Sequence, residues 1–197
     1  MSPLAAAASA WLATRRGEME DFLRRLVDID SGSRDRAGID AVGDAMAAML
    51  EADGIAVERY PDETYGAVLK AEVPGKVGGA PVLLMGHRDT VFPKGTVAFR
   101  PFSRDGDTAF GPGVADMKGG LVVDLFVLRA LKAAGGTDFP LIGLFTADEE
   151  IGSPSGRPMI ERIATGARGV QYRTGPGLGQ CRDRAQGRAD AAHHRHR

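Results

Sequence analysis

The sequence has few cysteines, almost no net charge and no long apolar run. It contains one cysteine, Cys181, which excludes an internal disulfide and leaves the redox compartment open. The formal net charge is −1, so electrostatics give no reason to expect nucleic acid or an acidic membrane as a partner. No apolar run approaches the about 20 residues that a membrane-spanning helix needs. We therefore expect neither nucleic acid nor a membrane as a partner.

The N-terminal segment lacks the pattern of a secretion signal. The opening MSPLAAAASAWLATRRGEMEDF is rich in alanine, but no basic segment precedes its apolar residues and it soon becomes charged. We interpret it as the start of a helix and expect a cytoplasmic protein. The 43% hydrophobic and 26% charged residues are typical of a globular protein. The length of 197 residues suits one ordinary domain, or a domain with a fragment of another.

Helices are predicted where apolar residues recur at helical intervals. Residues 3–30 predict one or two helices, and residues 39–50 predict another that ends before Gly54, a glycine suited to the left-handed position after a helix. Residues 118–136 predict a long apolar helix that ends in a glycine pair, and residues 155–164 predict a short one.

Strands are predicted between these helices. Residues 55–60 and 66–73 read as two strands with a turn between them, whereas residues 81–86 and 139–145 are continuous apolar runs of the kind found in strands buried on both faces. The alternation of strands and helices predicts an α/β fold with a mostly parallel, mixed sheet flanked by helices. We assign residues 1–170 to this domain. Residues 171–197 are rich in arginine and nearly free of aliphatic side chains, so we expect them to be disordered.

Polar residues follow both of the buried strands. His87 and Asp89 come directly after one, Glu149 and Glu150 come after the other, and Asp116 lies in a glycine-rich loop that leads into the long helix. In open α/β sheets, ligands bind beyond the carboxyl ends of the strands. An imidazole and several carboxylates at one rim predict a site for a divalent metal, and the histidine favours zinc.

Each of these residues also has an ordinary structural interpretation. A histidine after a strand is usually a surface or hydrogen-bonding residue, and Asp116 could cap the following helix. The two glutamates could be first-turn residues that the helix dipole favours. The glycines around Asp116 could form a phosphate loop, but Lys118 precedes glycines and no Ser or Thr follows it as a Walker motif requires.

The strings GHRDTVFPKG, GPGVADMKGG and TADEEIGS, in this order and spacing, resemble the dinuclear-zinc peptidase family. That family includes glutamate carboxypeptidase, acetylornithine deacetylase, succinyl-diaminopimelate desuccinylase and aminoacylase. The resemblance extends from about Phe22 to about Gly169, and the stretch GHRDTVFPKGTVAFRPF is most similar to the glutamate carboxypeptidase branch.

The resemblance implies a role for each residue. His87 would bind one zinc ion, Glu150 the other, and Asp116 would bridge the two. Asp89 would hydrogen-bond the imidazole and fix its tautomer. Glu149 would be the general base that moves a proton from water to the leaving amine. The glycines would let the backbone bend and approach the metals; they are Gly111, Gly113, Gly119 and Gly120.

The sequence departs from the family pattern towards its C-terminus. The family has a further carboxylate ligand in a Thr-Glu-Pro sequence, where this chain has Gly175 in RTGPGLG. The family also has a histidine ligand beyond an inserted dimerisation domain, and this sequence shows neither that histidine nor that domain. We do not assign this role to His193, His194 or His196, because AAHHRHR lacks the strand context of the family ligand. We therefore expect weak zinc binding and negligible hydrolysis from this sequence as written, and an uncertain oligomeric state.

A reading-frame error near Gly179 is our hypothesis for this departure, because an out-of-frame reading of a GC-rich gene yields arginine, alanine, glycine and histidine without aliphatics. Resequencing the gene tests it: the hypothesis fails if no single-base change restores a long family-like frame.

The function that the motifs imply is zinc-dependent hydrolysis of an amide bond in a C-terminal glutamate-type peptide or an N-acyl amino acid. The alternatives are a biosynthetic N-acyl amino-acid deacylase and, in another class, an inactive fragment or non-catalytic interaction module.

Overall fold

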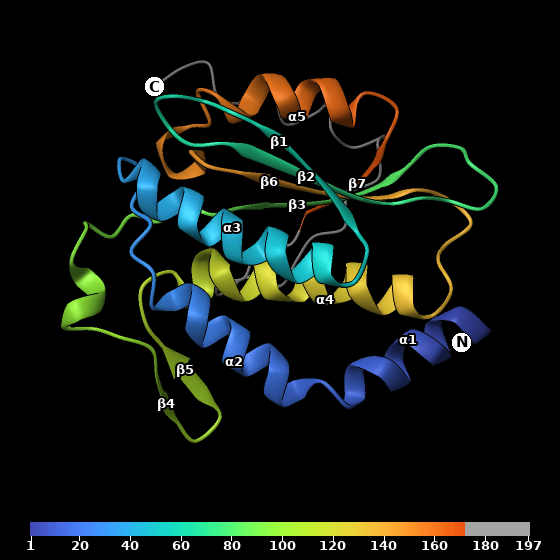
Figure 1. The fold of residues 1–197 in the computed structure, drawn as a ribbon, viewed down its shortest axis with the longest axis horizontal. Coiled ribbons are helices and arrows are strands. Elements are labelled where there is room, and N and C mark those ends of the chain that lie inside the picture. Colours follow the sequence, from blue (N-terminus) through green and yellow to red (C-terminus); the bar gives the residue numbers. More distant parts are fainter. Residues whose placement is uncertain (172–197) are drawn as a thin grey trace, which may run out of the picture.

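A computed structural model gives the structure of the chain, and it describes residues 1–171. Five α-helices and seven strands form within this range (Figure 1). The helices are α1 (Pro3–Ala13), α2 (Arg16–Val27), α3 (Arg36–Ala52), α4 (Gly119–Ala133) and α5 (Gly156–Ala164). The strands are β1 (Ala56–Tyr60), β2 (Val68–Val73), β3 (Val82–His87), β4 (Ser103–Asp105), β5 (Thr108–Phe110), β6 (Leu141–Thr146) and β7 (Arg168–Gln171).

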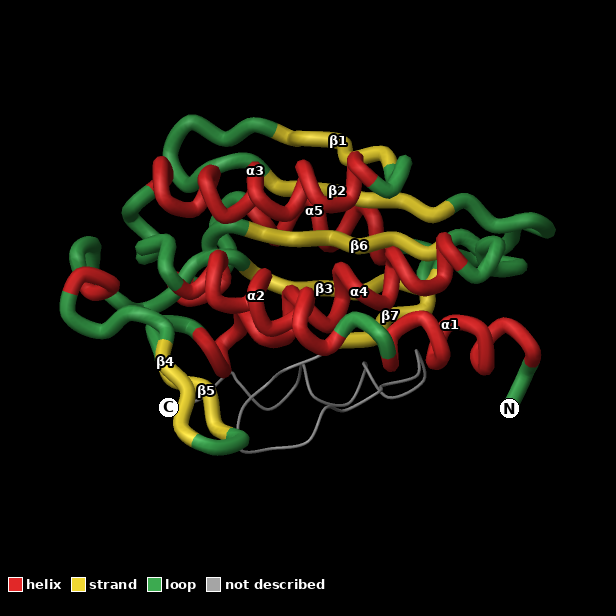
Figure 2. The backbone as a smooth tube through the Cα atoms, turned by 60° about the horizontal axis from the view of Figure 1, so that its bottom comes forward, coloured by secondary structure: helices red, strands yellow, loops and turns green. Residues whose placement is uncertain are grey.

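The main sheet is mixed. Its strand order is β1-β2-β6-β3-β7, as Figure 2 shows from one side. β1 pairs with β2 and β2 with β6 in antiparallel fashion, whereas β3 is parallel to both β6 and β7. The predicted α/β fold with a mixed sheet is confirmed, and its parallel part is the set β6, β3 and β7. His87 at the end of β3 lies opposite Thr146 at the end of β6, so the two strands end together.

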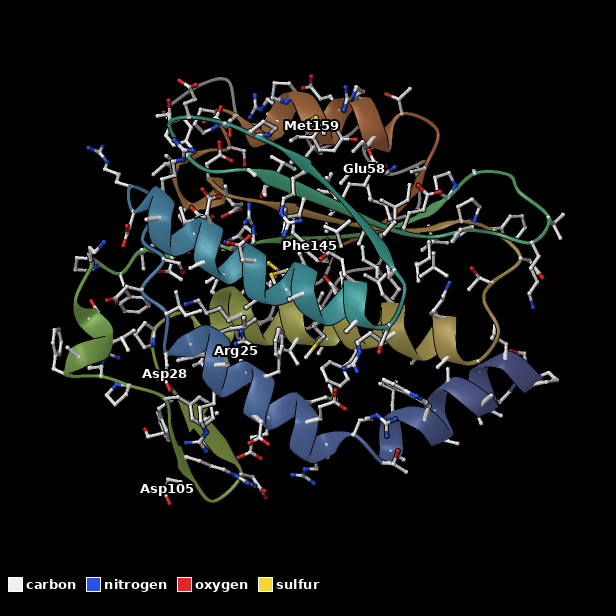
Figure 3. The ribbon with its side chains drawn as sticks, in the orientation of Figure 1. Arg25, Asp28, Glu58, Asp105, Phe145 and Met159 are labelled. Carbon is white, nitrogen blue, oxygen red and sulfur yellow. The ribbon has the colours of Figure 1, made fainter. Side chains whose placement is uncertain are left out.

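Helices cover both faces of the sheet. In Figure 1, α3 and α4 lie on one face and α5 on the other, while α1 and α2 form a further layer against α4. Phe145 of β6 packs in the larger core on the α3–α4 side, and Met159 of α5 packs against the smaller cluster on the opposite face (Figure 3). Every residue of β6 is buried, as expected for a strand between two layers.

Most predicted elements are present. The segment 3–30 forms two helices, and α3 ends before Gly54, whose φ is 70°. The four predicted strand segments contain β1 and β2 and overlap β3 and β6, each of which extends one residue further. The β4–β5 hairpin was not predicted, because its strands have three residues each and are largely exposed, which leaves no apolar run. β7 was not predicted either, and it ends at Gln171, where we expected the disordered segment to begin. Residues 172–197 lie outside the described residues.

Candidate metal centre

The predicted site residues lie at the carboxyl end of the parallel strands. His87 is the last residue of β3, and Asp89 lies two residues beyond it. Glu149 and Glu150 follow the neighbouring strand β6 in a short 3-10 turn, η3 (Glu149–Ile151). Asp116 reaches the same place from η2 (Val114–Lys118), the segment before α4. The sheet topology thus brings together residues that are far apart in the sequence.

Three of these side chains form a cluster with the composition of a metal site. His87, Asp116 and Glu150 each offer one ligand atom, and these atoms lie within 4.8 Å of one another. Nε2 of His87 lies 3.2 Å from Oδ1 of Asp116. An imidazole nitrogen and two carboxylates are a donor set that zinc accepts. The described residues therefore fit one zinc ion at this position.

Asp89 supports the cluster through hydrogen bonds. Its side chain is fully buried, and it accepts hydrogen bonds from the Ser33 hydroxyl (2.7 Å) and from the backbone N–H groups of Glu149 (3.0 Å) and Glu150 (3.1 Å). Nδ1 of His87 lies 3.0 Å from the Asp89 carbonyl oxygen and 3.3 Å from its carboxylate. Asp89 therefore orients both the imidazole and the turn that carries the glutamates.

The two glutamates occupy different places in this arrangement. Glu150 belongs to the three-residue cluster, whereas Oε2 of Glu149 lies 3.8 Å from Nε2 of His87. The turn that carries both of them is followed by Gly152, with a φ of 89°. Both glutamates are indeed first-turn residues of η3, so the structural interpretation from the sequence describes their backbone, while their side chains face the metal cluster.

The loop around Asp116 depends on a close approach of two segments. Gly113 has a φ of 71°, and a Cβ on it would lie 2.5 Å from Cγ2 of Thr90. Asp116 does not cap α4, because that helix has no side-chain cap and the Asp116 carboxylate lies against His87 instead. The peptide bond between Asp116 and Met117 is cis.

The four glycines do not share one role. Gly111 also has a positive φ, of 147°, whereas Gly119 has an ordinary helical φ of −61° and begins α4 together with Gly120. The bend therefore comes from Gly111 and Gly113, while Gly119 has a close approach of its own, because a Cβ there would lie 2.8 Å from the Val114 carbonyl oxygen.

Electrostatics in this cluster favour a bound cation. Burial of the His87 ring opposes its charged form, but the hydrogen bond to Asp89 and the charges of Asp89, Glu149 and Asp116 outweigh it and raise the pKa of His87 to about 9. Burial raises the pKa of Glu150 above its usual value. A positive charge among these carboxylates stabilises the ionised forms of all of them, and a metal cation can supply it.

Some residues of the site could not be recognised in the sequence. Ser33 lies in SGSRDRAG, which reads only as a loop by composition. Arg88 sits between His87 and Asp89, is 1% exposed, and donates to the carbonyls of Ile39, Ala67 and Thr146. It ties the end of β3 to α3, to the segment before β2 and to the end of β6. Long-range backbone acceptors of this kind leave no local sequence signal.

The likeness to known proteins extends over most of the described chain. The sequence pattern described as Peptidase family M20/M25/M40 matches residues 83–192. This chain belongs to that family. The match includes His87, Asp89, Asp116, Glu149 and Glu150.

Named members and solved structures show the same relationship. The M20-type chain is 42% identical over 146 residues to carboxypeptidase G2 of Pseudomonas sp. (strain RS-16), which covers 72% of the chain and 35% of that protein. It is 32% identical over 134 residues to succinyl-diaminopimelate desuccinylase of Novosphingobium aromaticivorans, covering 62% of the chain and 34% of that protein. It thus spans about a third of the length of these relatives.

The fold is shared with solved peptidase structures. Human carnosine dipeptidase 1 superposes with a TM-score of 0.73 at 19% identity, over 87% of this chain and 41% of that one. The M20 family metallo-carboxypeptidase Sso-CP2 from Sulfolobus solfataricus gives a TM-score of 0.67 at 22% identity, over 82% of this chain and 38% of that one. The expected resemblance is confirmed for family and fold, whereas the pair of zinc ions stays a prediction. Gly175 and the three C-terminal histidines lie outside the described residues, so the departures at those positions stay predictions.

No helix among residues 1–171 combines the length and apolarity that would let it cross a bilayer.

Proposed function

We propose that this chain carries the metal-binding part of a zinc-dependent hydrolase that cleaves the amide bond of an N-acyl amino acid or a C-terminal glutamate-type peptide. One observation carries the proposal: His87, Asp116 and Glu150 converge at the ends of two neighbouring parallel strands, with Glu149 beside them. The 42% identity to carboxypeptidase G2 supports a carboxypeptidase-like reaction.

The residues that would hold zinc are His87, Asp116 and Glu150. Zinc bound there would supply a Lewis acid that polarises the substrate carbonyl and makes water more acidic. The His87 ring would bind as the neutral imidazole through Nε2, because its Nδ1 faces the carbonyl oxygen of Asp89 and donates its proton there. Asp89 thereby fixes the tautomer that a metal ligand needs.

Glu149 would move the proton. Its carboxylate would accept a proton from the water that attacks the carbonyl carbon, and would later deliver this proton to the amine nitrogen as the C–N bond breaks. The hydrogen bond from its backbone N–H to Asp89 fixes the start of the turn and so limits the region that the side chain can reach. The carboxylate is about one-third exposed, which leaves it accessible to water.

A biosynthetic N-acyl amino-acid deacylase is the second candidate. The 32% identity to succinyl-diaminopimelate desuccinylase favours it. Both reactions cleave an amide with the same residues, so the acyl and amino-acid parts of the substrate distinguish them.

Hydrolysis of N-acyl glutamates tests the proposal. We expect negligible hydrolysis, no more than a trace activity, from the purified chain, because residues 1–171 supply three protein ligands for one metal ion and not for the pair that the family uses. This activity should require zinc, disappear on chelation, and be lost in Glu149→Gln. Glu161→Gln, on the exposed surface of α5, is the matched control and should keep it. Activity that survives Glu149→Gln would contradict the assignment, and zinc-loaded protein without any hydrolysis would favour the non-catalytic alternative.

A further inference from the structure

A polar pocket of about 240 Å³ lies between α3 and the loop that joins β1 to β2. Figure 2 shows this loop curving past the start of α3. The loop is tied to the helix, because Arg36 donates to the Glu63 carbonyl at 2.9 Å and the Asp40 carboxylate accepts from the Ala67 N–H at 3.0 Å. None of the three residues of the metal cluster lines the pocket. The pocket is thus a part of the fold that the proposed reaction does not use.

The charged side chains of the lining are equal in number and opposite in sign. They are Arg36, Arg59 and Arg88, and Asp40, Asp44 and Asp62. Four of them form two ion pairs at the rim, Arg36 with Asp40 and Arg59 with Asp44, each at 3.4 Å. Arg88 and Asp62 form no ion pair with any other of residues 1–171. One unpaired positive charge and one unpaired negative charge therefore line the same small pocket.

Arg88 supplies the positive charge. The residue is 1% exposed, and three of the five N–H groups of its guanidinium donate to the carbonyls of Ile39, Ala67 and Thr146. Gly43 of α3 makes room for this group, because a Cβ there would collide with Nη1 of Arg88. Carbonyl oxygens accept hydrogen bonds but carry no formal charge, and a buried charge is costly without a charged partner. A carboxylate is the group that fits a guanidinium in this state.

Asp62 supplies the negative charge. Its Oδ1 accepts from the backbone N–H groups of Thr64 at 2.9 Å and Tyr65 at 2.8 Å, which fixes the side chain. Within the described part of the chain, no residue donates to its Oδ2. The residue is half-buried, so this oxygen is held in place and can accept from an ammonium group of a ligand.

We propose that this pocket binds a small free amino acid, whose carboxylate pairs with Arg88 and whose ammonium group pairs with Asp62. A lining without net charge does not favour a ligand with a single charge of either sign, whereas a zwitterion satisfies both unpaired groups at once. The volume suits such a molecule, since a cavity of about 150 Å³ already holds benzene. The inference does not depend on the proposed function, because no group of the metal cluster takes part in it.

Three probes of similar size test this inference at neutral pH. L-alanine carries both charges, propionate only the negative one, and ethylamine only the positive one. Each would be titrated into the full chain with EDTA present, and the NMR chemical shifts of the backbone amides would report binding. We expect L-alanine to bind about tenfold more tightly than either other probe, because each of these lacks one charge-assisted contact. The largest shift changes should occur at Gly43 and Ala67, which line the pocket.

Two substitutions remove the two unpaired charges in turn. Asp62→Asn keeps the shape of the side chain and an oxygen that can accept from Thr64 and Tyr65, but it removes the charge. It should lower the affinity for L-alanine about tenfold, to that for propionate. Arg88→Met should abolish the preference for L-alanine over ethylamine. Circular dichroism would check the fold of Arg88→Met, and Asp62→Asn decides the question if that variant does not fold.

Asp138→Asn is the matched control. Asp138 is exposed in the loop before β6, at the opposite end of that strand from the pocket, and it forms no ion pair with another of residues 1–171. The substitution should leave the binding of L-alanine unchanged. Binding of L-alanine no tighter than that of propionate or ethylamine would overturn the inference. Shift changes centred outside the pocket, an unchanged affinity in Asp62→Asn, or an equal loss in Asp138→Asn would also overturn it.

Discussion

Asp89 connects several parts of the site. It accepts from Ser33, Glu149 and Glu150 and lies against the His87 ring. The hydrogen bonds from His87 and Ser33 outweigh burial and lower the pKa of the Asp89 carboxyl. A buried, ionised carboxylate in this place keeps the imidazole oriented and the glutamate turn in position.

Asp89→Asn should therefore weaken zinc binding without removing a ligand. The amide has the same shape but no charge, and its NH₂ group cannot accept a hydrogen bond from Glu149 or Glu150. We expect a loss of about 10–100-fold in zinc affinity, measured by competition with a chromophoric chelator. Ser33→Ala removes one of the bonds to the same carboxylate and should cost less. Unchanged affinity in Asp89→Asn would show that Asp89 does not orient the ligands.

Asp124 gives a prediction on stability and pH. It lies buried in α4, and neither of its carboxylate oxygens has a hydrogen-bond partner among residues 1–171. Burial raises the pKa of this carboxyl from 3.8 to about 8. Between these values the unfolded chain releases the proton and the folded chain keeps it, so stability falls as the pH rises from about 4 to about 8.

Asp124→Asn has no such titration. Relative to the variant, the wild type should lose on the order of a few kcal/mol of unfolding free energy across that pH range. Urea unfolding at a series of pH values measures the difference. A constant difference between pH 4 and 8 would mean that Asp124 is ionised in the folded protein.

At this scale the sequence predicted the residues of the cluster but not those that support it. His87, Asp116 and Glu150 could be predicted because polar side chains after buried strands meet at one edge of a sheet. Ser33 and Arg88 could not be predicted, because their hydrogen-bond partners are distant in the chain. Asp89 lies 56 residues from Ser33, and the three carbonyls that Arg88 contacts lie 21 to 58 residues from it.

Among the elements, the loop between β5 and α4 has a strict geometric requirement. At Gly113 the backbone adopts a φ of 71°, and the space for a side chain is taken up by Thr90. The loop carries Asp116 to the metal cluster and is anchored by Lys118, which is buried and donates to the Ile29 carbonyl at 2.7 Å. Its conformation therefore affects both stability and metal binding.

Gly113→Ala should lower the unfolding free energy by about 1–3 kcal/mol, because the added Cβ meets Thr90 and the left-handed backbone disfavours alanine. Urea denaturation followed by circular dichroism measures the effect. Gly17→Ala is the control: Gly17 lies in α2, and a Cβ there would meet nothing within 4 Å. It should be neutral or slightly stabilising. Equal effects of the two substitutions would contradict the close packing of this loop.

The elements that the sequence predicted are those with an uninterrupted apolar pattern. Strands β3 and β6 follow from continuous apolar runs, and α3 and α4 from helical spacing. The β4–β5 hairpin has exposed three-residue strands that pair only with each other. Its register depends on a turn at Gly106, with a φ of 56°, rather than on burial. Short exposed strands of this kind carry too little apolar periodicity to be recognised.

For the whole molecule, the layered arrangement explains why the site forms at one end of the sheet. The parallel strands β6, β3 and β7 lie side by side, and the loops that follow β3 and β6 meet where α4 begins (Figure 2). The mixed topology was predictable from the alternation of strands and helices. The strand order was not, because β6 inserts between β2 and β3 and so separates strands that are adjacent in the sequence.

The number of zinc ions per folded chain tests the central claim most directly. In equilibrium dialysis at saturating free zinc, the bound metal should approach about one zinc ion per chain, because residues 1–171 contain one group of three candidate ligands, which we expect to bind zinc weakly. His87→Ala should lose this ion, whereas Glu149→Gln should retain it, since Glu149 is assigned to proton transfer. A folded wild-type chain without zinc, or equal retention of zinc in His87→Ala, would contradict the account.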